Sequence, residues 1–141
     1  MKLISLNIEL NRHHDLVLPF LKKEKPDVIC LQELKAQAAD LSTGMCNPAT
    51  YQGFFHYAEK KGYSGVAVYS KTKPIAVRKN FGASPLSEEG RLLELEFEDF
   101  YFLNCYFPNG GQGPHRGGAG VRVSVPRSDR APSGQECPRG I

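Results

Sequence analysis

Residues 2–33 read KLISLNIELNRHHDLVLPFLKKEKPDVICLQE, and this stretch decides the fold class. It opens with an apolar run over residues 2–8 and closes with a second over residues 28–32, and each has the length of a buried strand. The residues between them predict a helix over about 13–25. A strand, a helix and a strand within about 30 residues form a βαβ unit, so the two strands are predicted to be parallel.

The predicted helix has an apolar face and recognisable ends. Asp15 is a suitable N-cap, lysines crowd the last turn where cations suit the helix dipole, and Pro26 ends the element. Pro19 is tolerable if it lies near the first turn. The residues predicted on the buried face are Leu16, Val17, Phe20 and Leu21.

The chain then changes to the patterns of extended strands. Residues 36–50 predict a short helix and loop, and residues 93–98 alternate strictly, which predicts one wet and one buried face. The result is a mixed sheet with helices on at least one side, and therefore an α/β fold. The predicted extended segments are 54–59, 64–70, 75–78, 92–98 and 101–107.

Composition divides the 141 residues into two parts. Residues 1–109 carry 13 Lys plus Arg against 13 Asp plus Glu, whereas residues 110–141 carry five Arg against two acids and hold eight of the 14 Gly. We predict a folded part over 1–109 and a Gly/Pro/Arg-rich, disordered tail over 110–141. The tail is either a basic arm that binds DNA non-specifically or a segment with no evolved role.

Several classes of protein do not fit the composition. Hydrophobic residues make up 40% and charged residues 23%, which is typical of a globular domain. Neither a long apolar run nor a signal-peptide pattern occurs, so no membrane association is expected and a cytoplasmic location is the default. The cysteines lack zinc-site spacing and are interpreted as structural; they are Cys30, Cys46, Cys105 and Cys137.

Polar residues end the two buried strands of the βαβ unit. Asn7 follows the first strand, and Glu33 follows the second. Ligand sites in open α/β sheets gather at the carboxyl ends of strands, so the two side chains converge if the strands are neighbours. One carboxylate and one amide suit Mg²⁺, which keeps several waters in its shell.

Four motifs in order carry a resemblance to a known family. The sequence resembles exonuclease III and the apurinic/apyrimidinic endonucleases, within the endonuclease/exonuclease/phosphatase superfamily, over about residues 1–116. This resemblance implies part of a four-layer α/β sandwich of the deoxyribonuclease-I-like type, roughly its first mixed sheet with flanking helices. The motifs are LQELK at 31–35, GYSGVA at 62–67, EGR at 89–91 and NCYFPN at 104–109.

The resemblance also implies a function and a set of site residues. It implies a Mg²⁺-dependent hydrolase of DNA phosphodiester bonds, with Mn²⁺ as an alternative ion, acting on double-stranded DNA at abasic sites or 3′ ends. Another phosphatase or phosphodiesterase of the superfamily, and a non-catalytic DNA-binding fragment, are the alternatives. The implied roles are metal binding by Glu33 and Asn7, catalysis by Tyr106 and Asn109, and DNA binding by Gly62, Tyr63 and Arg91.

The sequence departs from the family after its first half. The Gly-Asp-x-Asn motif and the late Asp-His pair of the family do not occur: Asp129 is followed by Arg130, and His115 lies in a Gly-rich segment. Two expectations follow. The chain looks truncated and should be catalytically impaired alone, because grouped catalytic residues fail together. One sheet face should be exposed and cause self-association.

Overall fold

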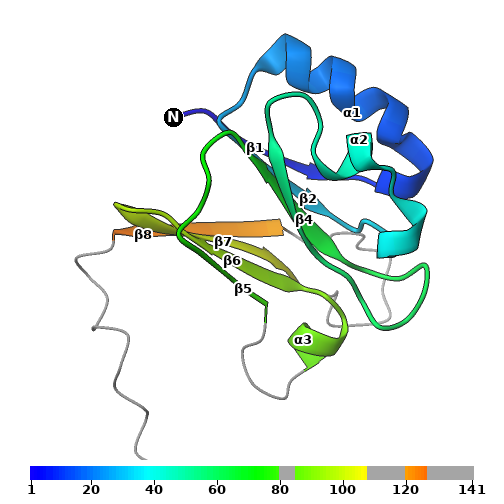
Figure 1. Ribbon diagram of the computed structural model, residues 1–141. Coiled ribbons are helices and arrows are strands. Elements are labelled where there is room, and N and C mark those ends of the chain that lie inside the picture. The colour runs from blue at the N-terminus through cyan, green and yellow to red at the C-terminus, as the bar shows by residue number, and fades with distance from the viewer. Residues whose placement is uncertain (80–84, 108–119, 127–141) are drawn as a thin grey trace, which may run out of the picture.

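The computed structural model describes residues 1–79 and 87–107 in full, and residues 85–86 and 120–126 as backbone (Figure 1). The described chain forms two four-stranded sheets, in the orders β1-β2-β4-β3 and β5-β6-β7-β8. The strands are β1 (Leu3–Asn7), β2 (Val28–Gln32), β3 (Gln52–His56), β4 (Val66–Ser70), β5 (Ala76–Arg78), β6 (Leu92–Glu96), β7 (Phe100–Tyr106) and β8 (Gly120–Pro126).

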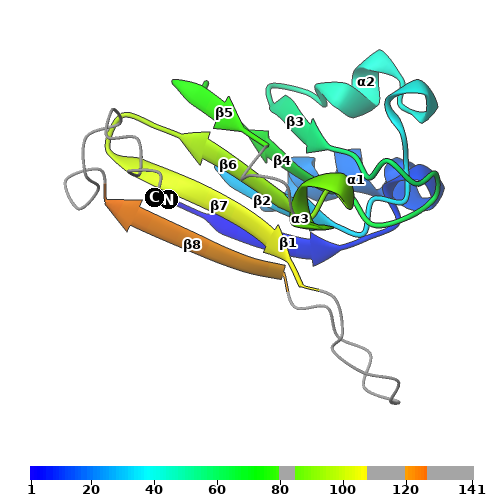
Figure 2. The ribbon, with the colours of Figure 1, turned by 90° about the horizontal axis from the view of Figure 1, so that it is seen from below.

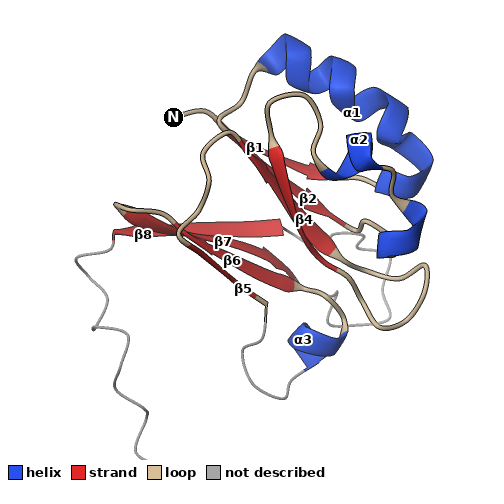
Figure 3. Cartoon of the chain, in the orientation of Figure 1, coloured by secondary structure: helices blue, strands red, loops and turns tan. Residues whose placement is uncertain are grey.

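The helices are few and unevenly placed. The long helix α1 and the short α2 lie on the outer face of the first sheet, away from the second sheet (Figures 1 and 3). No helix of the described residues is long and apolar enough to cross a membrane. The helical elements are α1 (Leu10–Glu24), the 3-10 turn η1 (Ala38–Asp40), α2 (Thr43–Cys46) and α3 (Pro85–Glu88).

The first sheet confirms the predicted βαβ unit. β1 and β2 are parallel neighbours in the register Leu3↔Val28 to Asn7↔Gln32, and α1 makes the crossover between them. β4 pairs antiparallel with β2 and with β3, so the sheet is mixed as predicted. The register places the carboxyl ends of β1 and β2 at the same edge of the sheet.

A second, antiparallel sheet packs on the inner face of the first, as Figure 2 shows. The predicted partial α/β sandwich is confirmed; it includes this second sheet beside the mixed one, so the face expected to be exposed is covered. This removes the reason given for self-association. The apolar cluster between the sheets takes Val28, Cys30, Val66 and Val68 from one sheet and Leu93, Leu95, Phe97, Phe102 and Tyr106 from the other side.

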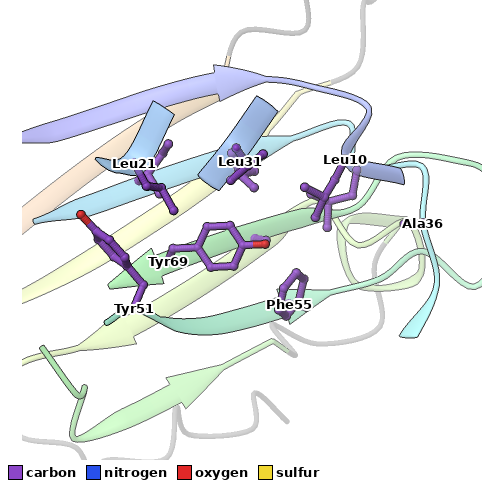
Figure 4. Close-up of a cluster of buried hydrophobic side chains, with 11 residues drawn as sticks. Leu10, Leu21, Leu31, Ala36, Tyr51, Phe55 and Tyr69 are labelled. Carbon is purple, nitrogen blue, oxygen red and sulfur yellow. The ribbon is translucent and has the colours of Figure 1, made fainter. Parts of the chain in front are cut away.

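A second apolar cluster lies between the first sheet and the helices (Figure 4). Tyr69 lies at its centre and packs edge-on against Phe55, with ring centroids 5.8 Å apart. Leu10 and Leu21 reach it from the two ends of α1, each 1% exposed. This cluster attaches α1 to β2 and β4, and so holds the loop that follows β1.

Helix α1 begins earlier than its sequence predicts. It starts at Leu10, with Glu9 at the N-cap position, and Asp15 lies within it. The backbone N–H of Leu10 donates to the Leu34 carbonyl, and the Leu10 side chain is in the core, so tertiary contacts recruit the extra turn. His13 departs from helical geometry, at a kink between the added first turn and the rest of α1. Leu16, predicted on the buried face, is 58% exposed.

The strictly alternating strand β6 is buried on both faces, which corrects the prediction of a wet face. Glu94 and Glu96 are 2% and 7% exposed. Arg78 on the neighbouring strand β5 donates to both carboxylates, at 2.9 and 2.6 Å. Burial of these acids is tolerable because each is paired with the same guanidinium.

Part of the predicted tail has structure. Residues 120–126 form β8 and pair antiparallel with β7, where we predicted disorder. Alternating Val121, Val123 and Val125 suit an edge strand that an existing sheet can accept. Residues 108–119 and 127–141 lie outside the described residues, so the rest of that prediction, with its boundary at 109, stays a prediction.

Candidate active site

The candidate site begins at the edge where β1 and β2 end. Asn7 is the last residue of β1 and is exposed, and Glu33 follows β2 at the same edge. The parallel register places the ends of these two strands side by side, which is the condition for the predicted convergence of Asn7 and Glu33. Glu33 has a positive φ of 56°. A non-glycine residue rarely adopts this conformation, and such outliers concentrate at functional sites.

Tyr106 reaches the same edge from the other sheet. It is the last residue of β7, and its hydroxyl donates a short hydrogen bond to Oε1 of Glu33. The two residues are 73 positions apart in sequence. The site is therefore built at the seam between the sheets, with the carboxylate from one sheet and the phenol from the other.

Two turns hold the Glu33 backbone in place. Backbone N–H groups of Leu34 and Lys35 donate to the carbonyls of Gly65 and Ser64, at 3.2 and 2.9 Å. Gly65 has a φ of +89°, and a Cβ there would lie 3.3 Å from the Leu34 side chain. Only a residue without a side chain brings the second turn this close without strain.

Lys35 adds positive charge near the Glu33 carboxylate. Its ammonium donates to Oε1 of Glu9 at 2.7 Å, and this hydrogen bond raises the pKa of Lys35 while lowering that of Glu9. The charge of Glu33 raises the pKa of Lys35 further. Lys35 is therefore a fixed cation at the edge of the candidate site.

Gly62 and Tyr63 form an exposed turn beside the site. Gly62 has a φ of +70° with open space around its Cα, and Tyr63 is 37% exposed. The ammonium of Lys60 lies 5.3 Å from the centroid of the Tyr63 ring. The turn thus presents an aromatic ring and a cation to solvent, which suits a polyanionic ligand.

Arg91 lies beneath that turn, with its side chain only 3% exposed. Its Nη2 donates to the Tyr63 hydroxyl at 2.9 Å, and its Nε makes a short ion pair with Glu89. Its Cζ lies 5.5 Å from the Tyr63 ring centroid and 5.0 Å from that of Tyr106. The structure therefore brings Arg91, Tyr63, Tyr106 and Glu33 into one connected group.

A buried polar network behind the site was not predicted. Asn104 of β7 is fully buried and donates to the carbonyls of Leu31 and Ala67, at 3.1 and 2.9 Å. It also accepts from Nε2 of Gln32 at 3.0 Å, and Gln32 in turn bonds to Ser5. The sequence signal for this network is the occurrence of polar Asn104 and Gln32 within apolar runs.

Asn109, predicted to be catalytic, lies outside the described residues. Within residues 1–79 and 85–107, no group of three or more His, Cys, Asp or Glu side chains is close enough to hold a metal ion. The available oxygen donors at the edge are the Glu33 carboxylate and the Asn7 amide. This set suits an ion that takes one carboxylate and keeps its waters.

Two tyrosines with raised pKa values are expected to make the protein less stable at alkaline pH. Burial, followed by the hydrogen bond to Glu33, raises the pKa of Tyr106 to about 12, and burial raises that of Tyr57 to about 12. An unfolded tyrosine loses its proton near pH ~10. Between these values the unfolded state binds fewer protons, so the free energy of unfolding falls as pH rises from about 10 to 12.

Urea denaturation at pH 8, 10 and 11 measures this effect. The decline should be shallower in Tyr106→Phe, which lacks one of the titrating phenols. Equal slopes in the two proteins would show that Tyr106 ionises as it does in the unfolded chain.

The fold and site define an α/β sandwich whose polar centre lies at the seam of two sheets. The chain belongs to the endonuclease/exonuclease/phosphatase family, which it matches over residues 4–137. It is 41% identical over 120 residues to an exodeoxyribonuclease of Bacillus subtilis, covering 82% of this chain and 46% of the relative. It is 38% identical over 92 residues to a DNA-(apurinic or apyrimidinic site) endonuclease of Dictyostelium discoideum, covering 65% and 25%.

A solved structure gives the same result. A 3′ phosphatase from Neisseria, bound to a product DNA hairpin, superposes with a TM-score of 0.67 at 25% identity, over 78% of this chain and 42% of that one. The chain therefore spans less than half the length of these relatives. The family assignment confirms the resemblance inferred from the four motifs.

Proposed function

We propose that the protein acts in Mg²⁺-dependent hydrolysis of DNA phosphodiester bonds, at abasic sites and 3′ ends of double-stranded DNA. The observation that carries this proposal is the hydrogen bond from Tyr106 to Glu33 across the seam, with Asn7 at the adjacent strand end. The names of the relatives support it, because an exodeoxyribonuclease and an apurinic-site endonuclease both act on DNA. We also propose that the protein is located in the cytoplasm.

Glu33 and Asn7 are the residues that would hold the metal ion. Both lie at the open edge, and one carboxylate with one amide leaves room for waters and for a phosphate oxygen. When bound, Mg²⁺ or Mn²⁺ would stabilise negative charge that develops on the phosphoryl oxygens. Tyr106 holds Glu33 in one orientation, so the carboxylate is already placed for its ligand.

In this proposal Tyr106 and Asn109 act on the scissile phosphate. The Tyr106 phenol keeps its proton at neutral pH, because burial raises its pKa to about 12, and it is therefore a hydrogen-bond donor. This single proton is donated to Glu33 in the free protein, and it would turn to a phosphate oxygen when substrate is bound, where it would stabilise developing oxyanion charge. Asn109 follows β7 by three residues and would supply a second donor.

Gly62, Tyr63 and Arg91 form the DNA side of the proposal. An aromatic ring on an exposed turn can press against a distorted minor groove, and the Lys60 ammonium beside it can neutralise phosphates, while Arg91 supports the turn from within. An abasic nucleotide is the cheapest to move out of the helix, because it has no base pair to break. Duplexes with an abasic site should therefore bind more tightly than intact ones.

Catalysis by this chain alone is expected to be severely impaired. The described residues hold no group of three or more His, Cys, Asp or Glu side chains that could bind a metal ion, and catalytic groups that act together on one phosphate lose nearly all activity when some are missing. Metal and DNA binding are less demanding than turnover, and they make the more direct test.

The test measures Mn²⁺ binding by paramagnetic resonance in the full chain and in two variants. Glu33→Gln should weaken binding about tenfold or more, from an affinity on the order of millimolar, because it removes the carboxylate assigned as the metal ligand. Glu9→Gln is the matched control, since Glu9 is a nearby acid already paired with Lys35, and it should leave the affinity unchanged. Equal affinities in all three proteins would refute the metal assignment.

DNA binding and cleavage are measured on a duplex with one abasic site and on its intact counterpart, with Mg²⁺ present. We expect preferential binding of the abasic duplex with very slow cleavage. Rapid cleavage that Glu33→Gln abolishes would support the function and contradict the expected impairment. Absence of any preference for abasic DNA would contradict the proposed substrate.

A further inference from the structure

Arg91 is placed unlike a residue that contacts DNA directly. Its side chain is 3% exposed, so no face of the guanidinium lies open to a duplex. Two of its nitrogens are bound within the protein, to Glu89 and to the Tyr63 hydroxyl. The third, Nη1, is buried and has no hydrogen-bond partner among the described residues. A buried guanidinium that is not fully satisfied is costly, so its retention calls for a reason beyond stability.

The surroundings of Arg91 suggest that reason. Its guanidinium contacts two aromatic rings, with Cζ 5.5 Å from the Tyr63 centroid and 5.0 Å from the Tyr106 centroid. Its own backbone carbonyl accepts from the Tyr106 N–H at 2.8 Å. Arg91 is therefore tied to Tyr106 through both its backbone and its side chain, and to Tyr63 through its side chain.

The group extends in both directions. On one side, Tyr63 lies in the exposed turn and is also contacted by the Lys60 ammonium. On the other side, the Tyr106 hydroxyl donates to Glu33. Arg91 is the described residue that contacts both tyrosines, one exposed to solvent and one at the candidate metal ligand.

We propose that Arg91 is a positioning residue that couples the Gly62–Tyr63 turn to Tyr106, so that DNA seated on the turn sets the placement of the phenol at the phosphate. This inference rests on the proposed function for its DNA ligand, but the coupling itself is a property of the free protein. The coupling requires a planar cation that donates from defined directions while its faces contact aromatic rings. Lysine carries the same charge and lacks that geometry.

The substitution Arg91→Lys separates positioning from simple charge. If Arg91 served only as a positive charge toward DNA phosphates, lysine would keep most of the affinity. If Arg91 positions the two tyrosines, Arg91→Lys should weaken abasic-duplex binding about tenfold, the scale of one charge-assisted hydrogen bond. Arg78→Lys is the matched control, because Arg78 also binds carboxylates in the second sheet but has neither tyrosine as a partner in the described interactions. It should leave the affinity unchanged.

A spectroscopic experiment tests the coupling without DNA. The six tyrosines are replaced by 3-fluorotyrosine in the full chain, and Tyr63→Phe and Tyr106→Phe assign two ¹⁹F resonances. Tyr63→Phe removes only the hydroxyl that accepts from Arg91, and we expect it to move the Tyr106 resonance. In the Arg91→Lys background the same change should leave that resonance in place, as in a double-mutant cycle.

The outcomes separate the two proposals. If Tyr63→Phe leaves the Tyr106 resonance at the same chemical shift in the chain that keeps Arg91, the coupling is overturned, even if DNA binds normally. A chain that shows the coupling but does not bind abasic DNA overturns the proposed function and leaves the positioning role standing. If Arg91→Lys fails to fold, the response of Tyr106 to Tyr63→Phe still decides the question.

Discussion

Replacing Gly90 by alanine should lower the free energy of unfolding by more than about 3 kcal/mol, or prevent folding. Gly90 has a φ of +60°, and a Cβ there would lie 2.6 Å from the His56 carbonyl oxygen, with two further backbone atoms of residues 57 and 58 within 2.7 Å. Backbone atoms cannot swing aside as a flexible side chain would. The segment before Arg91 would have to leave the end of β3, where the Glu59 N–H donates to the Glu88 carbonyl at 2.9 Å.

Gly62→Ala is the matched control for this prediction. Gly62 has a similar φ of +70°, but nothing lies within 4 Å of the place that a Cβ would occupy. It should therefore cost about 1 kcal/mol, from the left-handed conformation alone. Urea denaturation followed by circular dichroism measures both variants. Similar losses would show that backbone conformation, and not close packing, decides the cost at Gly90.

Asn104→Leu should lower the free energy of unfolding by about 3 kcal/mol, because it removes three buried hydrogen bonds at about 1 kcal/mol each. The Asn104 amide extends from β7 to the carbonyls of Leu31 and Ala67 and to the side chain of Gln32, all on the first sheet. Leucine has a similar volume and leaves these groups unpaired inside an apolar cluster. The measurement is again denaturation by urea.

Ser5→Ala is the control at the other end of the same network. Ser5 is half-buried, and its hydroxyl bonds to the side chain of Gln32, so its loss should cost about 1 kcal/mol or less. The functional effect should differ as well. Gln32 precedes Glu33 and Asn104 lies two residues before Tyr106, so Asn104→Leu should also disturb the hydrogen bond between Tyr106 and Glu33. A loss below about 1 kcal/mol for Asn104→Leu would show that the sheets are held by apolar contacts alone.

The strands were largely predictable because apolar runs mark them directly. The βαβ unit over residues 2–33 has the predicted order and pairing. The start of α1 was not predictable from local signals, because Leu10 joins the helix through contacts with Leu34 and the core. The burial of β6 on both faces could not be predicted from the local sequence either, since it depends on Arg78, which lies 16 residues before Glu94.

The candidate site was predictable in part. The strand-end logic brings Asn7 near Glu33, and the family resemblance added Tyr106, whose contact with Glu33 the structure describes. The burial of Arg91 could not be inferred from its motif, because its guanidinium is covered by Tyr63 and Tyr106, which come from distant parts of the chain. The roles of all these residues in catalysis stay predictions until they are measured.

The seam between the sheets has a consequence for the order of folding. The Asn104–Gln32 and Tyr106–Glu33 hydrogen bonds join residues 72 and 73 positions apart, so neither forms until β7 has been synthesised. Until then, β2 carries a polar glutamine in an apolar strand with no partner from the second sheet. Contacts of such long sequence separation slow folding, often into the range of milliseconds to seconds. The residues that assemble the site are therefore expected to be among the last to acquire protection against hydrogen exchange during refolding.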